Sequence, residues 1–183
     1  MADKSKVNVG KPFVAGGIWR APVGTTLPTD ATTALNAAFK TVGYISEDGV
    51  TWSYSGDTED YRAWGGDVVH SEVQDTEDTA QFTMIESTNT EAVKAYWGDS
   101  AVTTNSTGYA VAVGEPDTTR YAWVMEMALQ GGGKRRIVIP EGFVSERGEI
   151  TYSDSELVGY DVTIQADRDS SGKYHYEYVK LSA

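Results

Sequence analysis

The chain has 183 residues, of which 40% are hydrophobic and 23% charged, and a formal net charge of −12. This length and composition fit one globular domain with a sizeable core and argue against wholesale disorder. The lack of cysteine excludes disulfide frameworks and thiolate metal sites. No apolar run approaches the roughly 18 residues of a membrane span, and residues 1–6 lack the apolar core of a signal peptide. We therefore expect a soluble product that is made in the cytoplasm and has no membrane partner.

The negative charge is concentrated between residues 47 and 78. Ten acidic residues lie in this stretch, and Arg62 is its only Lys or Arg. Such a field repels phosphate, which disfavours tight binding of nucleic acid through its backbone. The pattern fits a surface that DNA passes without sticking, and it also fits a solvated acidic face that aids solubility.

Most of the predicted elements are strands, because the dominant periodicity of the apolar residues is two. Phe82 and Met84, for example, alternate with Gln81 and Thr83. In chain order, the predicted strands cover residues 13–21, 50–55, 68–73, 80–84, 107–113, 121–125, 134–139, 157–166 and 173–181. The turn-forming sequence 167–172 predicts that the last two strands form a hairpin. This number of strands predicts a β-sandwich or a barrel.

One helix is predicted between the strands. Thr88 and Glu91 have the spacing of a capping box, and Gly98 is a helix stop. The apolar stripe of this helix consists of Val93, Tyr96 and Trp97. A second, weaker helical turn is predicted over residues 30–39, with Asp30 as its cap. The predicted buried side of that turn consists of Leu35, Ala38 and Phe39.

Two segments look under-packed for an isolated subunit. They are an N-terminal arm, residues 1–11, and the stretch 54–66, in which large aromatic residues stand among glycines and acids. Large aromatics in a polar segment usually contact something, which is either a partner surface or their own domain. The sequence leaves both readings open.

No motif for catalysis, a cofactor or a metal survives inspection. His70 and His175 are far apart and have no neighbouring cluster of metal ligands. Residues 167–172 resemble the start of a calcium loop, but the twelfth position is Tyr178 where a bidentate Glu is needed. Residues 131–133 lack the spacing of a phosphate loop and precede a strand. We expect no enzyme activity and no cofactor.

The basic residues after the glycine run are candidates for contacts between subunits. In an acidic chain they are expected to meet the acidic segment of a neighbouring copy. The candidates at this strand end are Lys134, Arg135 and Arg136, with Arg20 and Arg147 as further cations of the same kind.

Read in order, the segments resemble the major tail tube protein of long, non-contractile-tailed phages (siphophages), particularly those of actinobacterial hosts. The segments that carry the resemblance are 42–50, 61–69, 82–87, 96–98, 134–140 and 157–164. Each is short, and the resemblance depends on their order across residues 13 to about 169.

The resemblance implies a mainly β fold, with a β-sandwich or partial barrel, one flanking helix, a long loop and an extended N-terminal arm. Residues 1–183 are expected to form one tail tube domain, with a flexible arm at 1–11 and a long inter-ring loop at 53–66. The family behaviour implies hexameric rings that stack helically into a tube within the virion. The subunit is then synthesised in the host cytoplasm. DNA passes through the lumen during genome ejection without specific binding, and the further partners are the tape-measure, tail-tip and tail-terminator proteins.

Carried onto this chain, the resemblance implies two sets of site residues. The candidates for the contact between rings are Tyr54, Tyr61, Arg62 and Trp64. The acidic candidates for the lumen are Glu72, Asp75, Glu77 and Asp78. Alternation alone does not settle which face of each strand points inward.

Two other functions remain open at this point. A monomeric carbohydrate-binding β-sandwich would use exposed Trp and Tyr to stack on sugars. A tube protein of a phage-derived contractile or secretion system would share the fold.

Overall fold

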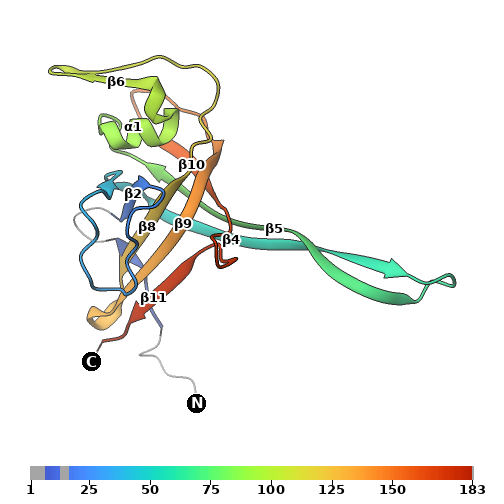
Figure 1. The fold of residues 1–183 in the computed structure, drawn as a ribbon. Helices are drawn as coiled ribbons and strands as arrows, with labels where there is room; N and C mark the ends of the chain where they lie inside the picture. Colours follow the sequence, from blue (N-terminus) through green and yellow to red (C-terminus); the bar gives the residue numbers. More distant parts are fainter. Residues whose placement is uncertain (1–6, 13–16, 183) are drawn as a thin grey trace.

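The structure, a computed structural model, describes residues 7–12 and 17–182, and it confirms a mainly β fold with one α-helix (Figure 1). The strands are β1 (Lys11–Pro12), β2 (Ile18–Pro22), β3 (Lys40–Thr41), β4 (Ile45–Arg62), β5 (Val68–Met84), β6 (Val102–Asn105), β7 (Gly108–Val111), β8 (Tyr121–Ala128), β9 (Lys134–Arg147), β10 (Tyr160–Ala166) and β11 (Tyr176–Lys180). The helix is α1 (Thr90–Trp97), and short 3₁₀ turns cover Asp99–Ala101 and Gln130–Gly132.

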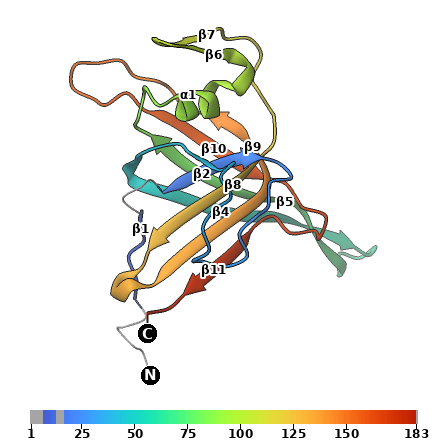
Figure 2. The same ribbon diagram turned by 60° about the vertical axis from the view of Figure 1, so that its left-hand side comes forward.

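The main sheet has the order β3-β2-β8-β9-β10-β5-β4, with β1 paired to β8 and β11 paired to β9. Strand β9 belongs to two layers, because its first part pairs with β11 and its last part, from Gly142, pairs with β10. Figures 1 and 2 show β4 and β5 crossing the direction of β8 and β9. We call β2, β8, β11 and the first part of β9 the covered layer, and β4, β5, β10 and the last part of β9 the open layer.

The main core lies between these two layers. Alternate residues of the open layer point into it, and β10 shows a strict alternation of buried and half-buried positions. The largest fully buried side chains of this core are Trp123, Ile18, Met84, Met125, Ile139 and Ile164. A smaller core around Phe39, Val124 and Val138 lies on the other face of the covered layer, where Leu27 and Leu35 pack against it.

Helix α1 closes one end of the main core. Its N-cap is Asn89, whose side chain accepts a hydrogen bond from the Glu91 N–H at 2.9 Å. The predicted cap, Thr88, is therefore one residue too early, and the predicted stop at Gly98 is confirmed. Tyr96 is buried and lies 5.1 Å from the ring of Tyr160 on β10, which holds the helix against the open layer.

Two sequence predictions of local structure are wrong. The last two strands do not pair as a hairpin, because β10 pairs with β5 and β9 while β11 pairs with the other end of β9. Residues 30–39 form bends and turns with no helix. There the Asp30 carboxylate accepts hydrogen bonds from the backbone N–H of Thr32 and from that of Thr33, so these groups are bonded locally without a helix. Of the predicted buried residues, Phe39 is the one that is buried.

The predicted loop at 53–66 is mostly strand. β4 continues to Arg62 and β5 starts at Val68, so the connection is only the turn of residues 63–67. The predicted strands 68–73 and 80–84 are likewise parts of the single strand β5. In the predicted N-terminal arm, residues 1–6 lie outside the described part of the chain, as do 13–16 of the predicted first strand.

Candidate functional site

The outer part of the β4–β5 hairpin projects far from the rest of the chain (Figure 1). We call residues 55–74 the assembly arm. Every described residue of this arm except Gln74 is exposed, so neither of its faces is covered by the body of the protein. A two-stranded ribbon with two exposed faces has little packing to hold its shape, which makes it suited to contacts with another molecule.

Trp64 lies at the tip of the arm. The tip is closed by hydrogen bonds from Ala63 N–H to the Asp67 carbonyl (2.8 Å) and from Gly66 N–H to the Ala63 carbonyl (3.0 Å). Gly65 and Gly66 both have positive φ, which this tight turn requires. The Trp64 side chain is 107% exposed, so the largest apolar side chain of the arm is not covered by any described part of the chain.

The two other aromatic candidates lie along the arm and at its base. Tyr61 is 44% exposed and stacks loosely on His70 across the ribbon, with ring centroids 5.7 Å apart. Tyr54 is 69% exposed and lies edge-on to Tyr174 at 6.5 Å. Arg62 donates to the Gly66 carbonyl at 3.1 Å and pairs with Asp60 at 3.5 Å, so it braces the turn while 58% of its side chain is exposed.

The arm also carries unbalanced charge. Five acidic residues lie within residues 55–74, against Arg62 as the only Lys or Arg. Glu59 and Glu72 are direct cross-strand partners. Like charges placed directly opposite each other destabilise a strand pair. Charge of this kind is typical of a surface kept for a partner or for electrostatic exclusion.

A second exposed surface covers the outer face of the open layer, and we call it the polar sheet face. It consists of Thr51, Ser53, Glu77, Thr79, Gln81, Ser145, Glu146, Thr163 and Gln165. These side chains line a concavity of about 350 Å³. The face arises from strict alternation, because the intervening residues on β5 and β10 are in the main core. None of its nine residues is apolar, aromatic or basic, and two are acidic.

The four predicted lumen residues separate into different surroundings. Glu77 is on the polar sheet face, whereas Glu72 is farther out on the arm. Asp75 has a positive φ of 49° next to the register shift between Ser55 and Asp57, and it is exposed. Asp78 is only 1% exposed, so the prediction that it lines a lumen is wrong. Because of the β-bulge at Asp75, counting alternate residues of β5 from Glu72 assigns Glu77 and Asp78 to the wrong faces of the strand.

Asp78 is instead the centre of a buried polar cluster at the base of the arm. It accepts a hydrogen bond from Trp52 Nε1 at 2.5 Å and forms an ion pair with His175 Nδ1. The hydrogen bond to Asp78 raises the pKa of His175 above its ordinary value of 6.5. The rings of Trp52 and His175 are 4.7 Å apart. The cluster ties β4, β5 and the segment before β11 together.

The basic candidates also differ from one another. Arg136 is 3% exposed, and its guanidinium is occupied within the chain by Glu126 and by the carbonyl oxygens of Asp30 and Thr33. It holds the 30–39 loop to β9, so it is unsuited to a contact between subunits. Arg135 is half-exposed and forms a 3.9 Å ion pair with Glu177, and its Nε has no hydrogen-bond partner among the described residues.

Lys134 lies in a basic row at the end of the covered layer. Its direct cross-strand partner on β11 is Lys180, and Ala128, on its other side, pairs with Lys11 on β1. Three cations in one row create a local positive charge near the end of the sheet. Lys134 thus remains a candidate for contacts with an acidic neighbour.

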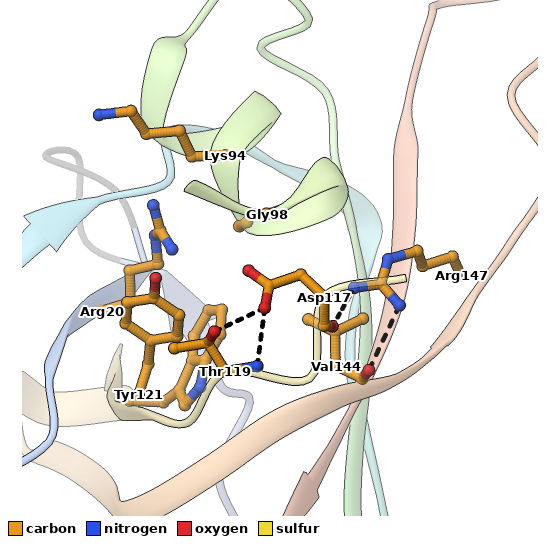
Figure 3. Close-up of a pocket in the computed structure, with 10 residues that line it drawn as sticks. Arg20, Lys94, Gly98, Asp117, Thr119, Tyr121, Val144 and Arg147 are labelled. Atoms are coloured by element: carbon orange, nitrogen blue, oxygen red, sulfur yellow. Dashed lines mark hydrogen bonds between the residues drawn. The ribbon is translucent and has the colours of Figure 1, made fainter. Parts of the chain in front are cut away.

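Arg20 and Arg147 are used inside the chain, around α1 (Figure 3). Arg20 is buried and bonds Asp99 at 2.7 Å and Glu91 at 3.1 Å. Arg147 donates to the carbonyls of Tyr96 (2.6 Å) and Asp117 (2.7 Å). The cavity between these side chains measures about 10 Å³, which is room for about one water. The cavity lies between closely packed, mostly polar side chains and is too small for a substrate.

Metal binding has no support in the described part of the chain. No group of three or more His, Asp or Glu residues with ligand-like geometry lies within residues 7–12 and 17–182. At the calcium-loop lookalike, Asp169 accepts hydrogen bonds from the N–H groups of Ser171 and Lys173 and closes an ordinary turn. Among the helices of the described residues, none has the length and apolar character needed to cross a membrane.

Comparison with known proteins bears on the remaining readings of this fold. A family profile described as phage tail tube protein matches residues 8–180, which is nearly the whole chain. The chain belongs to the phage tail tube protein family. A search of curated proteins found no match.

Family membership gives a context for the two exposed surfaces, the assembly arm and the polar sheet face. A tail tube protein is a structural component of the virion, and its family implies self-assembly into a tube. The family is structural and is not an enzyme family. The sequence predicts the aromatic residues of the arm as candidates, and of the polar sheet face it predicts Glu77 alone. The available signal was the alternation of uncharged polar residues at Thr51 and Ser53, Thr79 and Gln81, and Thr163 and Gln165.

Proposed function

We propose that this tail tube protein closes into hexameric rings that stack into the tube of a long, non-contractile tail and conduct DNA to the host. The observation that carries the proposal is the polar sheet face, which is concave, solvent-exposed and free of cations among its nine residues. We assign it to the lumen. Glu77 is the one acidic residue of the earlier lumen set that lies on it.

The chemistry of this face suits a conduit for DNA. Retention of DNA depends mainly on Lys and Arg that neutralise phosphates. The polar sheet face carries hydroxyl and amide groups and two carboxylates. These groups stay hydrated, and the carboxylates repel phosphate weakly. DNA can then pass without specific binding.

Ring closure would use the free edges of the open layer. Strand β4 is at the end of the sheet order and has no ladder partner on its outer side among the described strands. At the other side of this layer, β9 beyond Gly142 has no partner in β8. Pairing one edge with the other in a neighbouring copy would hide both from aggregation and continue the polar face around a ring.

The remaining partners follow from this assignment. The assembly arm and the N-terminal residues would connect successive rings, with Tyr54, Tyr61, Arg62 and Trp64 among the contacts. The tape-measure protein would occupy the lumen before DNA, and the tail-tip and tail-terminator proteins would bind the two ends. We further propose a siphophage of an actinobacterial host, in whose cytoplasm the subunit is made.

The two alternatives differ in how they fit these observations. A carbohydrate-binding module needs aromatic side chains on an open face, and the nine residues of the polar sheet face include none. A tube protein of a contractile or secretion system would share every feature described above. The genes next to this one would separate that case.

Thiol protection tests the lumen assignment, because the natural chain contains no cysteine. Thr51→Cys places a thiol at an exposed position of the polar sheet face, and Thr29→Cys places a matched thiol in the exposed loop on the opposite side of the protein. A polymer-linked maleimide too bulky to enter the tube should label both variants as free subunits and only Thr29→Cys in assembled tubes. Equal labelling of both variants in tubes would show that this face does not line the lumen.

A further inference from the structure

The β4–β5 ladder is interrupted where the assembly arm leaves the body of the protein. The register of β4 shifts between Ser55 and Asp57. At that point two residues of β5, Asp75 and Thr76, lie opposite the single residue Gly56. Among the described non-glycine residues, Asp75 is the one with a positive φ, at 49°. A β-bulge of this kind breaks the ladder and bends the ribbon, so the direction of the arm is set at this bulge.

A segment from the far end of the chain holds β5 beside the bulge. The Tyr174 hydroxyl donates a hydrogen bond to the carbonyl oxygen of Thr76 at 3.0 Å. The next residue, His175, forms the ion pair with the buried carboxylate of Asp78. We call Tyr174 and His175 the base clamp. It fixes β5 at two points, one in the bulge and one two residues closer to the body.

Tyr174 is held in place by contacts with its hydroxyl and its ring. Arg168 donates to the Tyr174 hydroxyl at 2.9 Å, and its guanidinium lies 5.0 Å from the centre of the ring. Tyr54 of β4 lies edge-on to the same ring at 6.5 Å. The base clamp thus contacts both strands of the hairpin.

Beyond the base clamp, no described residue outside the ribbon covers the arm. Residues 55–74 are exposed, with Gln74 as the exception. Figure 1 shows the ribbon projecting away from the body over this length. A projecting element moves about its last fixed point, where a few residues absorb the change in φ and ψ. The bulge and the base clamp together have the arrangement of a hinge with a restraint.

His175 makes this restraint depend on protonation. The acidic groups that face it are Asp78 from β5 and Glu177 from β11, and the Trp52 ring of β4 lies 4.7 Å away. The nearby cation, Arg168, is bonded to the neighbouring tyrosine hydroxyl. The hydrogen bond to Asp78 raises the pKa of His175, and burial opposes this increase. A charge-assisted hydrogen bond is roughly twice as strong as a neutral one, so loss of the proton weakens the clamp.

We propose that the base clamp is a proton-dependent restraint, which holds the arm in one direction while His175 is protonated and lets it move about the bulge when His175 is neutral. The restraint is complete at low pH and weakens as the pH rises through the folded-state pKa of His175. The inference goes beyond the proposed function, because it concerns the free subunit and does not depend on a tube. A segment held in one conformation before contact loses less entropy on binding, so the restraint favours contacts made through the arm.

Pulsed electron paramagnetic resonance on dilute, unassembled subunits tests the restraint. The natural chain has no cysteine, so Thr58→Cys on the arm and Thr29→Cys on the body provide two exposed sites for spin labels. We expect one narrow distribution of distances between the labels at pH 6. At pH 9 the distribution should be broader, with part of the population at new distances. An equally narrow distribution at both pH values would overturn the proposal.

Two pairs of variants in the labelled chain identify the groups responsible. His175→Gln cannot gain the charge and should give the broad distribution at both pH values, whereas His70→Gln, at the other histidine, should respond like the natural chain. Tyr174→Phe loses only the hydroxyl that bonds Thr76 and should broaden the distribution at pH 6, whereas Tyr152→Phe, at an exposed tyrosine, should not. A narrow distribution in His175→Gln or Tyr174→Phe at pH 6, or loss of the pH response in His70→Gln, would contradict the clamp. The natural chain needs no substitution in the clamp, so its response decides the proposal even where a clamp variant fails to fold.

Discussion

Removal of the Asp78 carboxylate should destabilise the subunit by about 3 kcal/mol. Asp78 is 1% exposed and serves both Trp52 Nε1 and His175. A hydrogen bond to a charged group contributes about 1.5–3 kcal/mol, and breaking a buried ion pair costs about 3–5 kcal/mol. We take the lower end because the His175 side chain is 25% exposed and water screens its charge.

Thermal unfolding of the Asp78→Ala subunit, followed by circular dichroism, measures this loss. For a domain of this size, about 3 kcal/mol corresponds to a Tm lower by about 6–12 °C. The matched control is Glu77→Ala, the neighbouring residue on the polar sheet face, which should stay within about 0.5 kcal/mol of the natural chain. If Asp78→Ala is as stable as Glu77→Ala, the cluster does not anchor the arm.

Three further results are expected. The folded-state pKa of His175 lies above its unfolded value of 6.5, so the stabilisation by its ion pair is complete below pH 6.5 and is lost as the pH rises through the folded pKa. Urea unfolding between pH 6 and pH 9 should show this loss of stability in the natural chain. The Asp78→Asn variant should not show it. Arg136→Ala should cost about 3 kcal/mol, because it leaves buried groups unpaired, whereas Arg135→Ala should cost under about 1 kcal/mol; denaturant midpoints that are equal would contradict this. Trp64→Ala should leave the circular dichroism spectrum and Tm of the free subunit unchanged, since the side chain is fully exposed, and unfolding of that variant would place Trp64 in a core.

The sequence predicted the elements that have one buried face. Phe82 and Met84 alternate with polar residues because one face of β5 packs on the core and the other faces water. The end of α1 at Gly98 is also predictable from the sequence, because it depends on a local feature: a φ of 95°, which suits glycine. The family was found from the order of such segments, and the profile match to residues 8–180 confirms it at the level of a tail tube protein.

The features that the sequence did not predict depend on distant contacts. The arm is strand on both sides of its turn, but its exposed faces give it no apolar alternation, so the sequence predicts a loop at 53–66 where β4 continues to Arg62. The pairing of β11 with β9 depends on the length of β9, which no local pattern reveals. In the sequence, Asp78 is one of a run of acidic residues. Its burial depends on contacts with Trp52 and His175, which come close to it only in the folded chain.

Electron microscopy of the purified, concentrated protein shows directly whether this subunit forms a tube with an open lumen. Light scattering on the same sample detects rings that have not stacked. We expect rings or tubes with a stain-filled centre. A subunit that stays monomeric at every concentration, or particles with a closed centre, would contradict it.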